Sequence, residues 1–90
     1  MSHKPVALPA MKLRDVLSIN MQAQRRARGL SQEALAHEAG VDRAYMSAIE
    51  RSVNSATLDM VEKIAKVLEV EPWILLKQPR RPRRKRRNPA

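Results

Sequence analysis

The chain has 90 residues and no cysteine, which allows one small domain and excludes disulfides and thiolate metal sites. No apolar run approaches the roughly 18 residues that a membrane-spanning helix needs, and the N-terminus lacks the long apolar core of a secretion signal. Phe is absent and there is one Trp and one Tyr, so the core has to be aliphatic.

The net charge of +9 is concentrated at one end of the chain. Residues 1–76 hold ten Lys and Arg against nine Asp and Glu, a balance of +1, whereas residues 77–90 hold eight basic residues and no acidic one. The body is therefore nearly neutral. Its affinity for an acidic partner has to come from the placement of individual charges.

The first elements are an arm and a helix. Residues 1–10, with Pro5 and Pro9, are predicted to form a flexible arm. A helix is predicted over residues 11–28, because apolar residues recur there at helical spacing. These residues are Leu13, Val16, Leu17 and Met21. Gly29 can adopt the left-handed conformation that ends a helix.

Two short helices are predicted next, on either side of Gly40, which permits a sharp reversal. Ser31 is a good N-cap for a helix over residues 32–38, and Asp42 is a good N-cap for one over residues 43–51. In the second of these helices, Met46 and Ile49 are expected to point inward. Four residues at positions i, i+1, i+4 and i+5 fall on the opposite face: Arg43, Ala44, Ser47 and Ala48.

A loop over residues 52–56 leads to a fourth predicted helix, which Thr57 caps. Its apolar stripe consists of Leu58, Val61, Ile64, Ala65 and Leu68. Pro72 suits the first position of a short fifth helix that includes residues 73–76. Residues 77–90 are expected to be a disordered basic tail, because they lack apolar residues able to fold back. The chain thus divides into an arm (1–10), an all-α domain (11–76) and a tail (77–90).

Two short helices around a tight turn are the pattern of a helix-turn-helix, in which one helix braces another that enters a DNA groove. Readout of the major groove needs donors or apolar groups on an exposed helical face. Arg43 can contact guanine O6 and N7, Ser47 can donate or accept, and Ala44 and Ala48 can touch a thymine methyl group. The alternatives are a solvated helix face and, for Arg43, a phosphate contact.

Residues 17–76 resemble the lambda-repressor-like helix-turn-helix family, also called the Xre/Cro family. The matching strings, in order, are RRARGLSQEALAHEAGV, YMSAIER, TLDMVEKIAKVLEV and PWILL. The resemblance implies a compact five-helix bundle that binds double-stranded DNA as a homodimer. It further implies a regulator of transcription that is cytoplasmic, nucleoid-associated, and bacterial or phage-encoded.

The resemblance also implies roles for individual residues. Base edges would be contacted by Arg43, Ala44, Ser47 and Ala48. Phosphates would be contacted by Gln32, Tyr45, Asn54 and Ser55, with Tyr45 alternatively a residue at the rim of the core. Arg25 and Glu50 would form a structural brace between the first and third helices, or alternatively an ion pair of little strength at the surface. The dimer interface would include Trp73, Ile74, Leu75 and Leu76.

Three positions depart from the family pattern. Ser52 and Glu69 stand where glycine is common, and a left-handed backbone at either position costs about 1 kcal/mol relative to glycine. Replacing either residue by glycine is therefore expected to raise the melting temperature. Asn54 stands where Lys or Arg is frequent, which predicts a weaker hold on phosphate.

The basic tail has three interpretations: a nucleic-acid-binding arm, a targeting signal, or a solubilising end. As an arm, it would contact phosphates through Arg80, Arg81, Arg83 and Arg84. Two alternatives to a sequence-specific regulator remain open. One is an antitoxin-type module that binds a small protein partner and represses its own operon, and the other is a nonspecific nucleic-acid-binding protein driven by the tail. Catalysis, cofactors and metals are not expected, because no nucleophile–base arrangement, phosphate loop or metal-ligand cluster is present.

Overall fold

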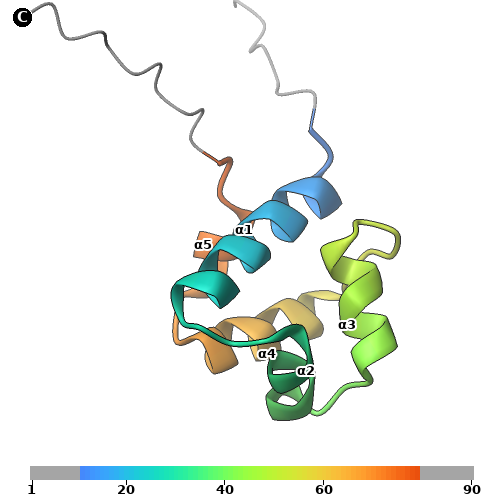
Figure 1. Cartoon of the computed structure of the whole chain (residues 1–90). Helices are drawn as coiled ribbons and strands as arrows, with labels where there is room; N and C mark the ends of the chain where they lie inside the picture. Colours follow the sequence, from blue (N-terminus) through green and yellow to red (C-terminus); the bar gives the residue numbers. More distant parts are fainter. Residues whose placement is uncertain (1–10, 80–90) are drawn as a thin grey trace, which may run out of the picture.

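The computed structural model describes residues 11–79, and its five helices pack into one bundle (Figure 1). The helices are α1 (Leu13–Ala27), α2 (Gln32–Ala39), α3 (Arg43–Glu50), α4 (Leu58–Leu68) and α5 (Pro72–Leu76). The predicted all-α fold with five helices is confirmed. The predicted arm, and the part of the predicted tail from residue 80 onward, lie outside the described residues.

The core lies where α1 packs against α3, α4 and α5 and where α2 packs against α3 and α4. Its largest fully buried side chains are Met21, Leu35, Met46, Ile49, Ile64, Leu68 and Leu75. Burying an aliphatic side chain of this size stabilises a fold by about 1.5–3 kcal/mol. The core is therefore aliphatic, as the composition requires.

Two residues of the predicted apolar stripes are exposed, which corrects the expectation that they belong to the core. Leu13 is 60% exposed and Leu58 is 76% exposed. Each is the first residue of its helix, where the Cα–Cβ bond tilts toward the N-terminus and carries the side chain past the packed interior. Both border a shallow apolar groove that also involves Leu17, Val61 and Leu76.

The three predicted N-caps are confirmed by hydrogen bonds from the first turn of each helix. Ser31 Oγ accepts the backbone N–H of Ala34 at 2.9 Å, and Asp42 Oδ2 accepts that of Ala44 at 2.9 Å. At α4, Thr57 Oγ1 accepts the N–H of Met60 at 3.0 Å. Each cap satisfies a donor that the helix itself leaves free and contributes about 1 kcal/mol.

A residue with a left-handed backbone follows each of the helices α1 to α4 within two positions. These residues are Gly29 (φ 68°), Gly40 (φ 73°), Ser52 (φ 61°) and Glu69 (φ 59°). The residue after each donates its N–H to a carbonyl five residues earlier, in the pairs Leu30–Arg25, Val41–Ala36, Val53–Ala48 and Val70–Ala65. This is the Schellman arrangement, which glycine normally favours. Ser52 and Glu69 therefore have the left-handed backbone on which the expected gain from glycine depends.

Glycine in place of Glu69 is expected to raise the melting temperature. The change removes a left-handed penalty of about 1–2 kcal/mol and loses an exposed ion pair with Arg28 (3.3 Å), worth about 0–1 kcal/mol. In a domain of this size, a gain of 1 kcal/mol corresponds to about 4–8 °C. Thermal unfolding followed by circular dichroism measures the shift.

The matched control is Glu69→Ala, which removes the carboxylate but keeps a β-carbon on the left-handed backbone. Glu69→Ala should not raise the melting temperature, and equal effects of alanine and glycine would contradict the interpretation. For Ser52→Gly we expect a smaller gain than for Glu69→Gly. The Ser52 hydroxyl donates to the Asp15 carboxylate near the start of α1, and glycine loses that bond.

Candidate nucleic-acid interface

The outward face of α3 forms a shallow polar depression. Asp42, Arg43 and Ala44 at the start of the helix line it together with Ser47 and Arg51. Arg43 and Ala44 are exposed and Ser47 is half-buried. The structure thus brings three of the four predicted base-contact residues onto one accessible surface, around the first two turns of α3.

Ala48, the fourth predicted base-contact residue, is buried, with 9% of its surface exposed. At about 100° per residue, Ala48 lies at the edge of the helical face whose centre is near Ser47 and residue 51. The loop after α3 also folds back at this point, where the Ala48 carbonyl accepts the N–H of Val53 at 2.8 Å. The prediction that Ala48 belongs to the exposed face is therefore wrong.

Arg51 takes the place on this face that the sequence analysis gave to Ala48. It follows Arg43 by eight residues and Ser47 by four, which puts all three on the same side of a helix. Arg51 is exposed, and its Nε lies 3.4 Å from Ser47 Oγ. The eight-residue spacing from Arg43 is the signal in the sequence for Arg51, which the predicted set of base-contact residues omits.

The four predicted phosphate contacts of the body do not all lie on the α3 face. Gln32 is half-buried at the first position of α2, and Tyr45 is half-buried against the core. Asn54 and Ser55 are exposed in the loop between α3 and α4. The position of Tyr45 fits the alternative of a residue at the rim of the core. The predicted phosphate contacts of the tail, from Arg80 onward, lie outside the described residues.

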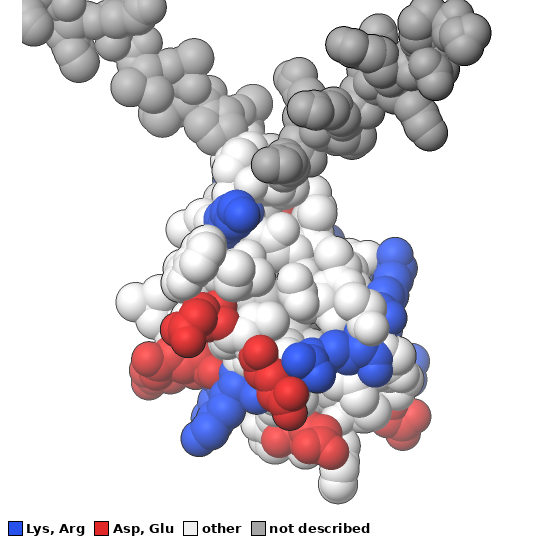
Figure 2. Space-filling model, turned by 90° about the vertical axis from the view of Figure 1, so that its left-hand side faces the viewer, with Lys and Arg blue, Asp and Glu red and all other residues white. Residues whose placement is uncertain are grey.

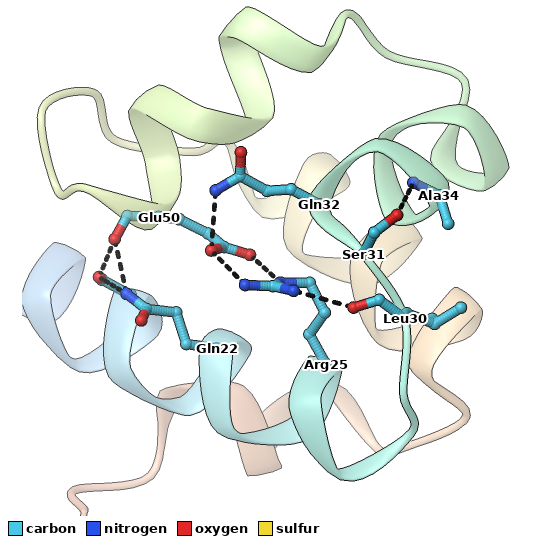
Figure 3. A network of polar contacts seen from close by, with 8 residues as sticks. Gln22, Arg25, Leu30, Ser31, Gln32, Ala34 and Glu50 are labelled. Atoms are coloured by element: carbon cyan, nitrogen blue, oxygen red, sulfur yellow. Dashed lines mark hydrogen bonds and ion pairs between the residues drawn. The ribbon is translucent and has the colours of Figure 1, made fainter.

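Glu50, the last residue of α3, is the centre of a polar network (Figure 3). Its side chain is 4% exposed and accepts Arg25 Nε at 2.6 Å and Arg25 Nη2 at 3.1 Å. Gln32 Nε2 also donates to the Glu50 carboxylate, at 3.0 Å. A buried charge is tolerated only when it is paired and hydrogen-bonded, as it is here. The ion pair therefore joins α1 to α3 as predicted, and it is enclosed.

The network extends to backbone atoms and involves two residues that sequence reasoning missed. Ser18 Oγ and Gln22 Nε2 both donate to the backbone carbonyl of Glu50, which fixes the end of α3 against α1 (Figure 3). Arg25 Nη1 donates to the Leu30 carbonyl at 2.8 Å, in the turn before α2. Ser18 and Gln22 are spaced i, i+4 beside the apolar stripe of α1, and that spacing was the available signal.

Helix α5 presents two kinds of side chain. Trp73 is 58% exposed, while Ile74 and Leu76 are half-buried. Leu75 is fully buried, which corrects its predicted place in a dimer interface. Asn20 on α1 donates to the backbone carbonyls of Leu75 and Lys77, and these bonds hold this turn of α5 against α1 with Leu75 inside.

The two arginines of the α3 face, Arg43 and Arg51, lie beside Asp42 in the same depression. Among the described residues, ion pairs engage Arg25 with Glu50 and Arg28 with Glu69, whereas neither Arg43 nor Arg51 on the α3 face is in one. Figure 2 faces the side of the bundle on which α5 lies, away from α3, and there acidic and basic side chains are mixed. The α3 face therefore offers two guanidinium groups to an acidic partner.

No helix among residues 11–79 has the length and apolar content needed to cross a membrane.

A family model described as "Helix-turn-helix" matches residues 21–72, which contain the second half of α1 and all of α2, α3 and α4. The chain is also 43% identical over 76 residues to a "Neisseria hypothetical transcription factor" from Neisseria meningitidis serogroup B, covering 83% of this chain and 72% of the relative.

Two solved structures and a further relative extend the comparison. The crystal structure of the hypothetical transcription factor NHTF from Neisseria superimposes with a TM-score of 0.75 at 43% identity, covering 83% of this chain and 87% of that one. The restriction-modification controller protein C.Esp1396I, solved as a tetramer with its natural 35 base-pair operator, gives a TM-score of 0.66 at 34% identity, covering 72% and 86%. Control protein C.BamHI from Bacillus amyloliquefaciens is 49% identical over 47 residues, covering 52% of this chain and 58% of the relative.

The matched region contains the helix-turn-helix and, apart from Ser18, the network around Glu50. This is a family of transcription factors without enzymatic activity. The chain belongs to the lambda-repressor-like helix-turn-helix family, and it is a DNA-binding transcriptional regulator.

Proposed function

We propose that the chain recognises a specific operator by placing the outward face of α3 in the major groove of duplex DNA. The observation that carries this proposal is the accessible surface around Arg43, Ala44 and Ser47, whose arginine is in no ion pair among the described residues. A nearly neutral body gains little from bulk charge. Individual groups on α3 therefore have to provide both affinity and discrimination.

The three side chains differ in what they can recognise. Arg43 can donate two parallel hydrogen bonds to guanine O6 and N7, the commonest specific contact in the major groove. Ala44 can pack against a thymine methyl group, and Ser47 can donate to or accept from several base edges. Because Asp42 Oδ2 is engaged in capping α3, its carboxylate is directed toward the backbone of the helix.

Gln32 would donate a hydrogen bond to a DNA phosphate beside α3. Its amide donates one hydrogen bond to Glu50, and an amide nitrogen carries two hydrogens. The second hydrogen is available to a phosphate at the N-terminus of α2, where the helix dipole also favours an anion. Asn54 and Ser55, both exposed, would contact the sugar-phosphate backbone of the DNA from the loop after α3.

We propose that two copies bind a palindromic site through an interface that includes the exposed Trp73. One recognition helix reads only a few base pairs, whereas a two-fold dimer reads half-sites about 34 Å apart. The similarity to C.Esp1396I, whose structure contains a tetramer on its operator, supports an assembly on DNA. The basic residues from position 80 onward would add sequence-independent contacts to phosphates.

Replacing Arg43 by alanine tests the proposal. We expect the change to weaken binding to an operator duplex, obtained by selection from a pool of random sequences, by about 1–3 kcal/mol, because a bidentate base contact is lost. Binding to a duplex of random sequence should weaken much less. Fluorescence anisotropy with both duplexes at fixed salt concentration measures the two losses.

Arg26→Ala is the matched control, since Arg26 is an exposed arginine on α1. It should leave discrimination between the two duplexes unchanged. Equal losses on both duplexes for Arg43→Ala would contradict a base contact and show that Arg43 binds phosphate.

A further inference from the structure

We infer that Arg51 is a second specificity-determining residue, which reads a guanine in the same half-site as Arg43; this inference rests on the proposed placement of α3 in the major groove. The first observation is the position of Arg51 on the helix. It follows Arg43 by eight residues, and the two residues line one depression at its opposite ends.

The direction of the Arg51 side chain favours the bases over the phosphate backbone. Its Nε lies 3.4 Å from Ser47 Oγ, so the side chain runs back along α3 over the exposed face instead of extending past the end of the helix. Arg51 is exposed and is in no ion pair among residues 11–79. Its guanidinium group is therefore directed over the surface that Arg43 and Ala44 present, with Nε donating to Ser47 and the two terminal nitrogens in no ion pair among residues 11–79.

The spacing between the two arginines predicts the spacing of their targets. Eight residues of α-helix correspond to about 12 Å at 1.5 Å per residue. Successive base pairs are about 3.4 Å apart along the duplex, and the Arg51 side chain runs back toward Ser47, so the two guanidinium groups would contact positions no more than about three base pairs apart. Arginine recognises guanine through O6 and N7 more often than any other base edge. The half-site should therefore contain two guanines with this separation.

Selection of bound duplexes from a random pool, followed by sequencing, tests the inference with the full chain and three variants. Wild type should enrich a motif with both guanines. Arg51→Ala should lose enrichment at one of them and bind the wild-type site about 5- to 150-fold more weakly. Arg43→Ala is the matched control and should lose the other guanine only.

Arg51→Lys separates base readout from phosphate binding, because lysine keeps the charge but lacks the planar guanidinium fork that holds two parallel hydrogen bonds to guanine in a fixed geometry. We expect it to lose the same guanine as Arg51→Ala. A motif that stays unchanged in both Arg51 variants, with weaker binding to every duplex in Arg51→Ala, overturns the assignment of Arg51 and leaves the proposed function standing. The absence of any motif with wild type overturns both.

Discussion

Replacing Arg25 by alanine is expected to lower the free energy of unfolding by about 3–5 kcal/mol, because the change leaves a buried carboxylate without its partner. Glu50 is 4% exposed and takes two of its three side-chain hydrogen bonds from Arg25. The same change removes the donor to the Leu30 carbonyl in the turn before α2. Chemical denaturation at fixed protein concentration measures the loss.

The exposed pair between Arg28 and Glu69 provides the matched control. Its side chains are 38% and 72% exposed, so Arg28→Ala should change stability by no more than about 1 kcal/mol. A double variant, Arg25→Met with Glu50→Leu, should recover much of the stability that Arg25→Ala loses, because neither charge is then buried alone. Equal effects of Arg25→Ala and Arg28→Ala would contradict an enclosed brace.

The brace also has a consequence for DNA binding. Ser18, Gln22 and Arg25 fix Glu50 from α1, and Gln32 fixes it from α2 (Figure 3). The end of α3 is thus held from two directions, while the residues of its outward face remain free. A recognition helix held in this way keeps its angle to the rest of the domain when it enters a groove, so little ordering is needed on binding.

Replacing Leu75 by alanine is expected to lower the free energy of unfolding by about 2–5 kcal/mol, the usual effect of truncating a fully buried leucine. Leu75 has no exposed surface and packs in the main core cluster. Because α5 contributes only five residues, the loss of its single fully buried side chain should release it from α1 and α4. Chemical denaturation measures this effect as well.

Trp73→Ala, two residues earlier, is the control that separates folding from assembly. Trp73 is 58% exposed, with the Lys77 ammonium 5.7 Å from the centre of its ring. At high protein dilution, where a dimer dissociates, its effect on stability should be small. If α5 forms the dimer interface, Trp73→Ala should weaken self-association in sedimentation equilibrium. A larger loss of folding stability for Trp73→Ala than for Leu75→Ala would contradict these assignments.

Local signals were sufficient to predict the helices and their ends. Ser31, Asp42 and Thr57 cap the helices that they were predicted to cap, because an N-cap depends on a hydrogen bond within three residues. The glycines of the family pattern at positions 52 and 69 indicate a left-handed backbone there, and Ser52 and Glu69 adopt it. The first helix was predicted to begin two residues too early, since Lys12 provides no side-chain cap to mark its start.

The errors arose where tertiary packing decides which residues are exposed. Ala48 lies at the edge of a helical face, and the returning loop determines that it is buried. In a helix of five residues, periodicity could not separate the buried Leu75 from the exposed Trp73. The i, i+4 spacing of Ser18 and Gln22 marks them as neighbours on α1, but the bond from Ser18 to the Glu50 carbonyl joins positions 32 residues apart, so no local pattern identifies its partner.

The proposed function requires that the outward face of α3 is the surface that contacts DNA bases. Amide chemical-shift mapping of the full chain, titrated with a selected operator duplex, tests it most directly. We expect the largest chemical-shift changes at Arg43, Ala44 and Ser47, with smaller ones at the start of α2 and in the loop at residues 54–55. Changes confined to α4 and α5, with those three amides unaffected, would contradict it.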